Sequence, residues 1–203
     1  MPQSTLSSTD RTTLRRKKDR ASMDRTQLHA ILDEALIAHV GFTASHGPVV
    51  LPMTYARIDD ALYLHGAIGN DLLRHAADGV DVCATVTLLD GLVLARSAFH
   101  HSMNYRCAVV FGRAERVTDP AELRAMSVAL VDHLSPGRSA EARPPTAEEL
   151  RATLAIRLSL DEASVKVRTG GPVDDAEDLA LPVWAGVIPT ELRRGEPIAD
   201  PGS

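Results

Sequence analysis

The sequence predicts a mainly β fold, a six-stranded antiparallel barrel with flanking helices. Short runs rich in Val, Ile, Thr and Tyr are separated by turn residues, which is the pattern of hairpins. The helical segments do not alternate one-for-one with these runs, which argues against a doubly wound parallel sheet. No dinucleotide-binding glycine fingerprint and no P-loop sequence occurs, so the nucleotide-binding α/β classes are disfavoured.

The helices are recognised by their caps and by apolar spacing. Asp24 or Thr26 precedes a helix that we expect to end near His39, and Thr146 with Glu149 forms a capping box. The expected helices are 24–39, 70–79, 120–133 and 146–156. The expected strands are 40–45, 49–58, 61–66, 80–89 with a turn at 90–91 and a restart over 92–95, 105–117 and 159–169.

Charge and cysteine usage limit the function classes. The net charge of −5 leaves no footprint for nucleic acid or an anionic membrane. No apolar run is long enough to span a bilayer, and there is no secretory signal. Cys83 and Cys107 lie in apolar β runs, which fits free thiols in a cytoplasmic protein.

Composition also divides the chain. Residues 1–23 are polar and basic, and we expect a disordered leader there. The pattern of a folded domain covers 24–190, and 191–203 read as a solvated tail. We expect one domain with its core built from aliphatic residues, because aromatic residues make up 3% of the chain.

The stretch 49–74 is the first candidate site. Two strands joined by Asp59-Asp60 lead through His65-Gly66-Ala67 to Asn70, a predicted helix N-cap. A strand that passes through small residues into a helix start is suited to holding a phosphate. Pro52 cannot donate a ladder hydrogen bond, so we expect an edge or a bulge there.

A metal site is disfavoured. His65, His100 and His101 are the conceivable ligands, but their spacing matches no regular zinc site. Adjacent histidines on extended chain also point to opposite sides. We therefore predict no metal.

What remains are groups suited to a flat, phosphorylated aromatic cofactor. They combine an irregular strand, a small-residue loop, two cations and two aromatic rings. We expect the cofactor to be bound by Pro52, Met53, Thr54, His65, Gly66, Ala67, Asn70, Leu72, Arg74, Tyr105, Arg106 and Trp184. For Arg106, an ion pair at the sheet edge is an equally good interpretation.

Three blocks of this sequence resemble the pyridoxamine 5′-phosphate oxidase-like flavoproteins, and in particular the branch of nitroimidazole-resistance proteins. The blocks are VVLPMTYARIDDALYLHGAIGN, the segment from LDGLVLARS through SMNYR to VVFGRAERV, and KVRTGGPVDDAEDLALPVWAGVIP. The resemblance implies the FMN-binding split β-barrel. It also implies a homodimer with an FMN site at each side of the subunit interface, and a catalytic position for His65.

The resemblance has one departure. Relatives often carry Lys or Arg just after the His-Gly segment, where this chain has Ile68-Gly69-Asn70-Asp71. Arg74 or the backbone cradle would have to compensate. The terminal Arg and His of true pyridoxamine phosphate oxidases are not evident, so vitamin B6 oxidation is not expected.

The expected function is an FMN-dependent oxidoreductase acting on a small organic substrate, in which the flavin carries the redox chemistry. His65 would donate a proton, because its ordinary pKa lies near neutrality. One alternative is a non-catalytic flavin-binding or flavin-sensing protein. Another is a haem-binding split barrel with His65, His100 or His101 as axial ligand.

Overall fold

The computed structural model describes residues 5–202, except for the side chains of Asp71 and Leu72. The chain forms two compact units. Unit 1 comprises the chain up to Leu88 together with Arg106–Val167, and unit 2 comprises Leu89–Tyr105 together with the chain from Arg168 onward. Each unit is described below by itself.

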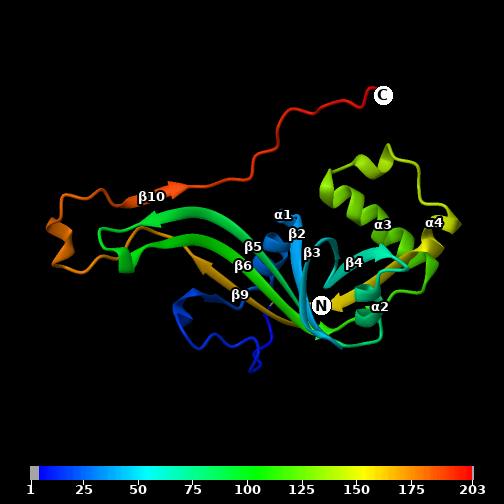
Figure 1. The fold of residues 1–203 in the computed structure, drawn as a ribbon, viewed down its shortest axis with the longest axis horizontal. Helices are drawn as coiled ribbons and strands as arrows, with labels where there is room; N and C mark the ends of the chain where they lie inside the picture. The colour runs from blue at the N-terminus through cyan, green and yellow to red at the C-terminus, as the bar shows by residue number, and fades with distance from the viewer. Residues whose placement is uncertain (1–4, 203) are drawn as a thin grey trace. The chain divides into compact units, whose positions relative to one another are not determined.

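The expected fold class is confirmed, with ten strands in the described chain where six were expected. The strands follow the order β1-β9-β6-β5-β2-β3-β4-β8-β7. The pairs β1–β9, β2–β3, β2–β5, β3–β4, β4–β8 and β7–β8 are antiparallel, and so is the pair of β10 with β5 (Figure 1). The strands are β1 (Ala21–Ser22), β2 (Ile37–Ala44), β3 (Gly47–Ile58), β4 (Ala61–Ala67), β5 (Asp81–Leu94), β6 (Ser102–Arg113), β7 (Glu115–Arg116), β8 (Thr153–Ser159), β9 (Glu162–Arg168) and β10 (Gly186–Pro189).

The helices begin where their caps were predicted. The Asp24 carboxylate accepts a hydrogen bond from the Thr26 amide, and Thr146 and Glu149 form the reciprocal capping box. The α-helices are α1 (Arg25–Glu34), α2 (Asp71–Ala77), α3 (Pro120–Leu134) and α4 (Ala147–Ala152). The short 3-10 helices are η1 (Lys18–Arg20), η2 (Ala98–His100), η3 (Arg138–Ala140) and η4 (Asp178–Ala180). In the described chain, no helix has the length and hydrophobicity needed to cross a membrane.

Several predicted boundaries are corrected. Helix α1 ends at Glu34, and His39 lies in β2 opposite Thr85, because residues 37–44 alternate between exposed and buried positions as a strand does. Helix α4 ends at Ala152, and residues 153–156, predicted as the end of that helix, begin β8, whereas the strand predicted over 159–169 is β9. Residues 154–156 are buried on both faces of β8, in the larger and the smaller core, and this burial overrides the helical reading.

The turn predicted at Asp90-Gly91 is also wrong, because β5 continues to Leu94. Gly91 pairs with Pro189 of β10, and a side chain on Gly91 would lie 3.0 Å from Val187 Cγ1. The glycine therefore permits a close approach of β10 and does not form a turn. Strand β10 was not predicted, and it follows an irregular segment.

The described part of the N-terminal segment packs on other residues of unit 1. Leu6 is 4% exposed in the core, and the Thr9 hydroxyl donates to the Glu162 carboxylate over 2.5 Å. Ala21 pairs with Lys166 of β9. The described part of residues 1–23 thus packs on the barrel, while the boundary predicted at residue 23 stays a prediction.

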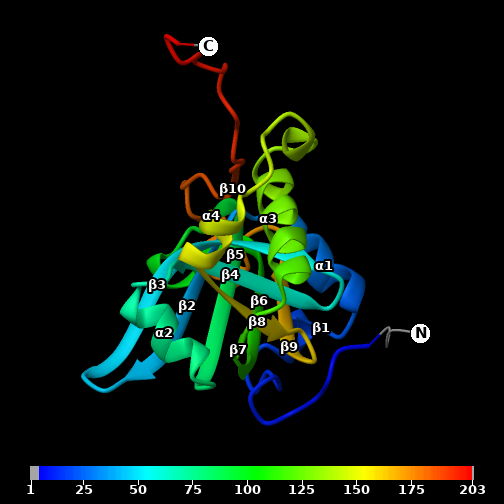
Figure 2. The same cartoon turned by 90° about the vertical axis from the view of Figure 1, so that its right-hand side faces the viewer.

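Two apolar cores stabilise unit 1. The larger lies inside the barrel and includes Leu28, Tyr55 and Ile156, and α2 contributes Leu73 to it. The smaller is formed by α3, α4 and the outer face of β4 and β8, with Tyr63 and Met126 among its members. Figure 2 shows α3 and α4 in front of β4 and β8. Successive residues of β4 therefore face the two cores alternately.

Unit 2 is held by polar contacts between its two segments. The Arg96 guanidinium and amide each lie 2.8 Å from an oxygen of Asp174. Arg168 donates to the Asn104 side-chain oxygen, and both residues are buried. These contacts bind the segment after β9 to the chain around η2.

Candidate functional site

The strands β3 and β4 separate at one point, where half of the predicted site residues lie. Their pairing runs from Ile58 and Ala61 to Tyr55 and Leu64. Beyond that point β3 pairs with β2, and β4 pairs with β8 through Ala67. We call the opening between residues 52–54 and 65–67 the β3–β4 fork. In the described chain, neither segment pairs with the other across it.

The fork confirms that Pro52 lies at a local edge. Pro52 pairs with His39 of β2, whereas the pairing with β4 starts only at Tyr55. Pro52 is exposed, and Met53 and Thr54 are half-buried. Backbone groups on the open side of this edge are therefore accessible to the rim of a flat ligand.

A small-residue loop connects the fork to α2. A Cβ on Gly66 would lie 2.6 Å from Leu73 Cδ1, so a larger residue would collide with α2. Asn70 is the predicted cap, since its side-chain oxygen accepts the Leu73 amide over 3.1 Å. Its own amide donates to the Ala67 carbonyl over 2.8 Å, which closes the loop.

His65 lies at the fork, and its side chain is exposed. The ring makes no hydrogen bond to any described residue. Desolvation by surrounding atoms lowers the pKa of His65 below its ordinary value of 6.5. The imidazole is therefore neutral near pH 7, with one nitrogen to donate and one to accept a hydrogen bond.

The remaining predicted residues are placed differently. Both terminal nitrogens of Arg106 contact the Glu34 carboxylate, at 2.5 and 2.8 Å. This is the ion pair that the sequence left open. Arg74 is exposed on α2, and the Leu72 side chain lies outside the described residues.

Tyr105 and Trp184 belong to unit 2. Tyr105 is half-buried, and Trp184 is 63% exposed. The Trp184 ring lies over Gly186, where an added Cβ would come within 2.8 Å of the ring. Their binding roles stay predictions.

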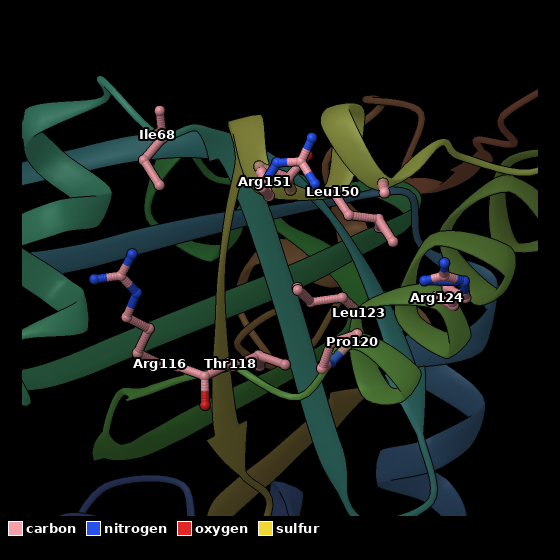
Figure 3. Close-up of a pocket in the computed structure, with 11 residues that line it drawn as sticks. Ile68, Arg116, Thr118, Pro120, Leu123, Arg124, Leu150 and Arg151 are labelled. Carbon is pink, nitrogen blue, oxygen red and sulfur yellow. The ribbon is translucent and has the colours of Figure 1, made fainter.

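A cavity of about 330 Å³ opens on the α3–α4 side of unit 1 (Figure 3). Leu123 and Leu150 form part of its apolar surface. In Figure 3 these leucines lie between Arg116 on one side and Arg124 on the other, with Arg151 above. We call this the arginine pocket.

The arginine pocket adjoins the loop that follows the fork. Ile68 lines it, and the Ile68 amide donates to the Ala152 carbonyl over 2.9 Å. Thr153, another lining residue, pairs with Ala67 of β4. Ala67 and His65 are two residues apart, so both lie on the face of β4 that the pocket borders.

Comparisons with known proteins agree with this architecture. A family model described as pyridoxamine 5′-phosphate oxidase matches residues 24–167. The chain belongs to this family. The resemblance found in the sequence is thereby confirmed, although no curated protein matches the chain.

Solved structures similar to this family member extend the comparison. The flavocytochrome Anf3 from Azotobacter vinelandii is 42% identical, with 95% of this chain and 90% of that chain covered and a TM-score of 0.89. The FAD and haem binding protein from Mycobacterium smegmatis is 40% identical, with 90% and 89% covered and a TM-score of 0.86.

A structure named for 5-nitroimidazole antibiotic resistance, from Bacteroides thetaiotaomicron, is 24% identical. The match covers 72% of this chain and 86% of that chain, with a TM-score of 0.59. At this identity the likeness supports the fold alone. The flavin-binding character of the family is consistent with the fork of this member.

Sequence reasoning missed the cations of this family member that lie beside the loop. Arg116 is on β7 and Arg151 on α4, yet both line the pocket with Ile68. The sequence pattern of the family places a cation at positions 68–71. Arg116 and Arg151 lie about 50 and 80 residues further along the chain, so that pattern does not include them. No sequence motif marks either of them.

Proposed function

We propose that this protein binds a flavin at the β3–β4 fork and acts as an oxidoreductase on a small organic substrate. The observation that carries the proposal is the fork itself, in a chain about 40% identical to two structures named for flavin and haem. The open strand edges and the glycine-containing loop are suited to a flat ring system with a phosphate.

The residues present fit such a group. Backbone groups of residues 52–54 would contact the ring edge, and Gly66 and Asn70 would form the loop next to the phosphate. A bound flavin supplies the electron transfer, while the chain positions it and excludes water. His65, being neutral, would hold a proton at one ring nitrogen and donate it to a substrate at the fork.

The proposal also specifies which flavin is bound, FMN or FAD. FMN is the cofactor that the family resemblance implies, and it combines a flat ring with a phosphate, the two groups that the fork and loop are suited to hold. One of the 40% identical relatives is named for FAD, whose FMN half would occupy the same place. We propose FMN, with FAD as the alternative, in a homodimer.

The test is titration of the purified full-length protein with FMN and FAD, followed by absorbance and tryptophan fluorescence. We expect saturable uptake and a dimer by light scattering. The variant Ala67→Phe places a bulky ring at an exposed fork position and should weaken binding about tenfold or more. Ala125→Phe, on the exposed side of α3, is the matched control. No uptake of either flavin would overturn the proposal.

A haem-binding function is the second candidate, because both relatives at 40% identity or above carry haem or cytochrome in their names. The His100 ring lies 3.0 Å from Asp175, and His101 lies 2.9 Å from the Ser97 carbonyl. His65 lacks a hydrogen-bond partner among the described residues, so it is the first ligand candidate. A Soret band on haem titration that His65→Ala removes and His101→Ala retains would support this function.

A further inference from the structure

The arginine pocket carries a cluster of positive charges that the β3–β4 fork lacks. Its lining contains three arginines, Arg116, Arg124 and Arg151, and no acidic residue. The three come from different elements, β7, α3 and α4. Three positive charges around one cavity repel each other, so an anion bound among them is stabilised by all three.

These guanidinium groups are available. Within the described chain, none of the three makes a hydrogen bond or an ion pair, unlike Arg106, Arg143 and Arg157. A guanidinium group without an ion-pair partner offers two parallel N–H donors, in the geometry that phosphate oxygens accept.

The carboxylates near the pocket are engaged elsewhere. Glu115 pairs with Arg157, and Glu122 accepts the Tyr63 hydroxyl over 2.7 Å. Asp119 caps α3 through the Ala121 amide. None of these three carboxylates forms an ion pair with a pocket arginine in the described chain, so the guanidinium groups keep their donors for an anion.

The interior of the pocket is apolar. Val117, Leu123 and Leu150 are at most 8% exposed and belong to the smaller core, and Ile68 and Pro120 add apolar surface at the rim. A cavity of about 330 Å³ is at the lower end of the range for small-molecule sites, roughly 300–1,000 Å³. It suits an organic body of modest size with charges at its edge, and inorganic phosphate would leave the apolar surface uncovered.

We propose that the arginine pocket binds an organic phosphate carrying at least two negative charges. The phosphate oxygens would contact the guanidinium groups, and the organic part would cover Leu123 and Leu150. Two sources supply this chemistry. One is the phosphate-bearing tail of a flavin at the fork, since Ile68 and Thr153 link the pocket to the fork loop. The other is a separate nucleotide.

The test is calorimetric titration of the full-length protein as purified with ADP at low ionic strength, with adenosine and inorganic phosphate as comparison probes. We expect one saturable ADP site that weakens as salt is added. Adenosine lacks the charges and phosphate lacks the apolar body, so both should bind at least about tenfold more weakly.

The variants Arg116→Gln, Arg124→Gln and Arg151→Gln should each weaken ADP binding about tenfold, the loss of one charged hydrogen bond. Arg193→Gln removes the same charge from the exposed C-terminal tail and should leave binding unchanged. The three pocket guanidinium groups make no hydrogen bond or ion pair in the described chain, so the melting temperatures should match. No saturable ADP binding, or an equal loss in Arg193→Gln, would overturn the proposal.

Repeating the titration with FMN or FAD added identifies the source. Loss of the ADP site in the presence of FAD, or of either flavin, assigns the pocket to the flavin tail. ADP binding that persists with both flavins assigns it to a separate nucleotide. Because ADP is measured directly, failure of flavin uptake would overturn the proposed function and leave this inference standing.

Discussion

Gly66 lies directly beneath Leu73, so close that a methyl group on Gly66 would come within 2.6 Å of the leucine Cδ1. This contact fixes the distance between the end of β4 and helix α2. The loop that connects them, with Asn70 as its cap, depends on it. The shape of the fork is therefore set by packing inside the barrel.

Replacing Gly66 with Ala should destabilise the protein by about 1–3 kcal/mol, because Leu73 would have to leave its rotamer or α2 would have to shift. Gly69→Ala is the matched control, since nothing lies within 4 Å of a Cβ at that position. Urea denaturation measures both. Equal stability of the two variants would show that α2 moves freely.

Arg106→Gln tests the flavin role that the resemblance implies for this residue. Its ion pair with Glu34 is partly exposed, so the loss of stability should be about 0–1 kcal/mol. If Arg106 contacts flavin phosphate, the flavin dissociation constant should rise about tenfold. Glu34→Gln breaks the same pair and keeps the cation. An identical effect of both substitutions on flavin affinity would assign Arg106 a purely structural role.

The Glu149 carboxylate gives a stability component in the acid range. Hydrogen bonds from Arg143 and from the Thr146 amide lower the pKa of Glu149 to about 2 from its ordinary value of 4.5. Because the folded pKa is the lower one, this stabilisation is present above pH 4.5 and is lost as the pH falls toward 2. Glu149→Gln should remove this component from a pH series of melting temperatures. Glu148→Gln, one residue earlier and exposed, should retain it.

His65 should titrate below 6.5 in the folded protein. Its ring is partly desolvated, which disfavours the charged form. The unfolded chain then binds the proton more readily, so the contribution of this group to stability falls as the pH drops below 6.5. Proton NMR of the imidazole signals, assigned with His65→Gln, measures the pKa. A value above 6.5 would contradict the partial desolvation of the ring.

The local features of this fold were predictable. The caps at Asp24, Asn70 and Thr146 depend on residues within three positions of each other, and each was recognised from sequence. The hairpin of β3 and β4 and the edge at Pro52 were predictable for the same reason.

The features that depend on residues far apart in the chain could not be predicted from sequence. The end of α1 is set by the pairing of residues 37–44 with β3. The role of Gly91 is set by the close approach of β10. The arginine pocket joins side chains of β7, α3 and α4 that no spacing rule connects. Residues 52–54 and 65–67, predicted as binding residues, lie together at the fork, and their binding role stays a prediction, whereas the partner of Arg106 required coordinates.

The change of partner along β3, from β4 to β2, has a consequence for handling the protein. At the fork, two strand edges face a gap that a flat cofactor would cover. Without the cofactor, the amide protons of the two open strand edges should exchange quickly with solvent. A strand of another molecule could also pair with these edges. We therefore expect the cofactor-loaded form to resist proteolysis and to remain monodisperse on storage, and the stripped form to aggregate first.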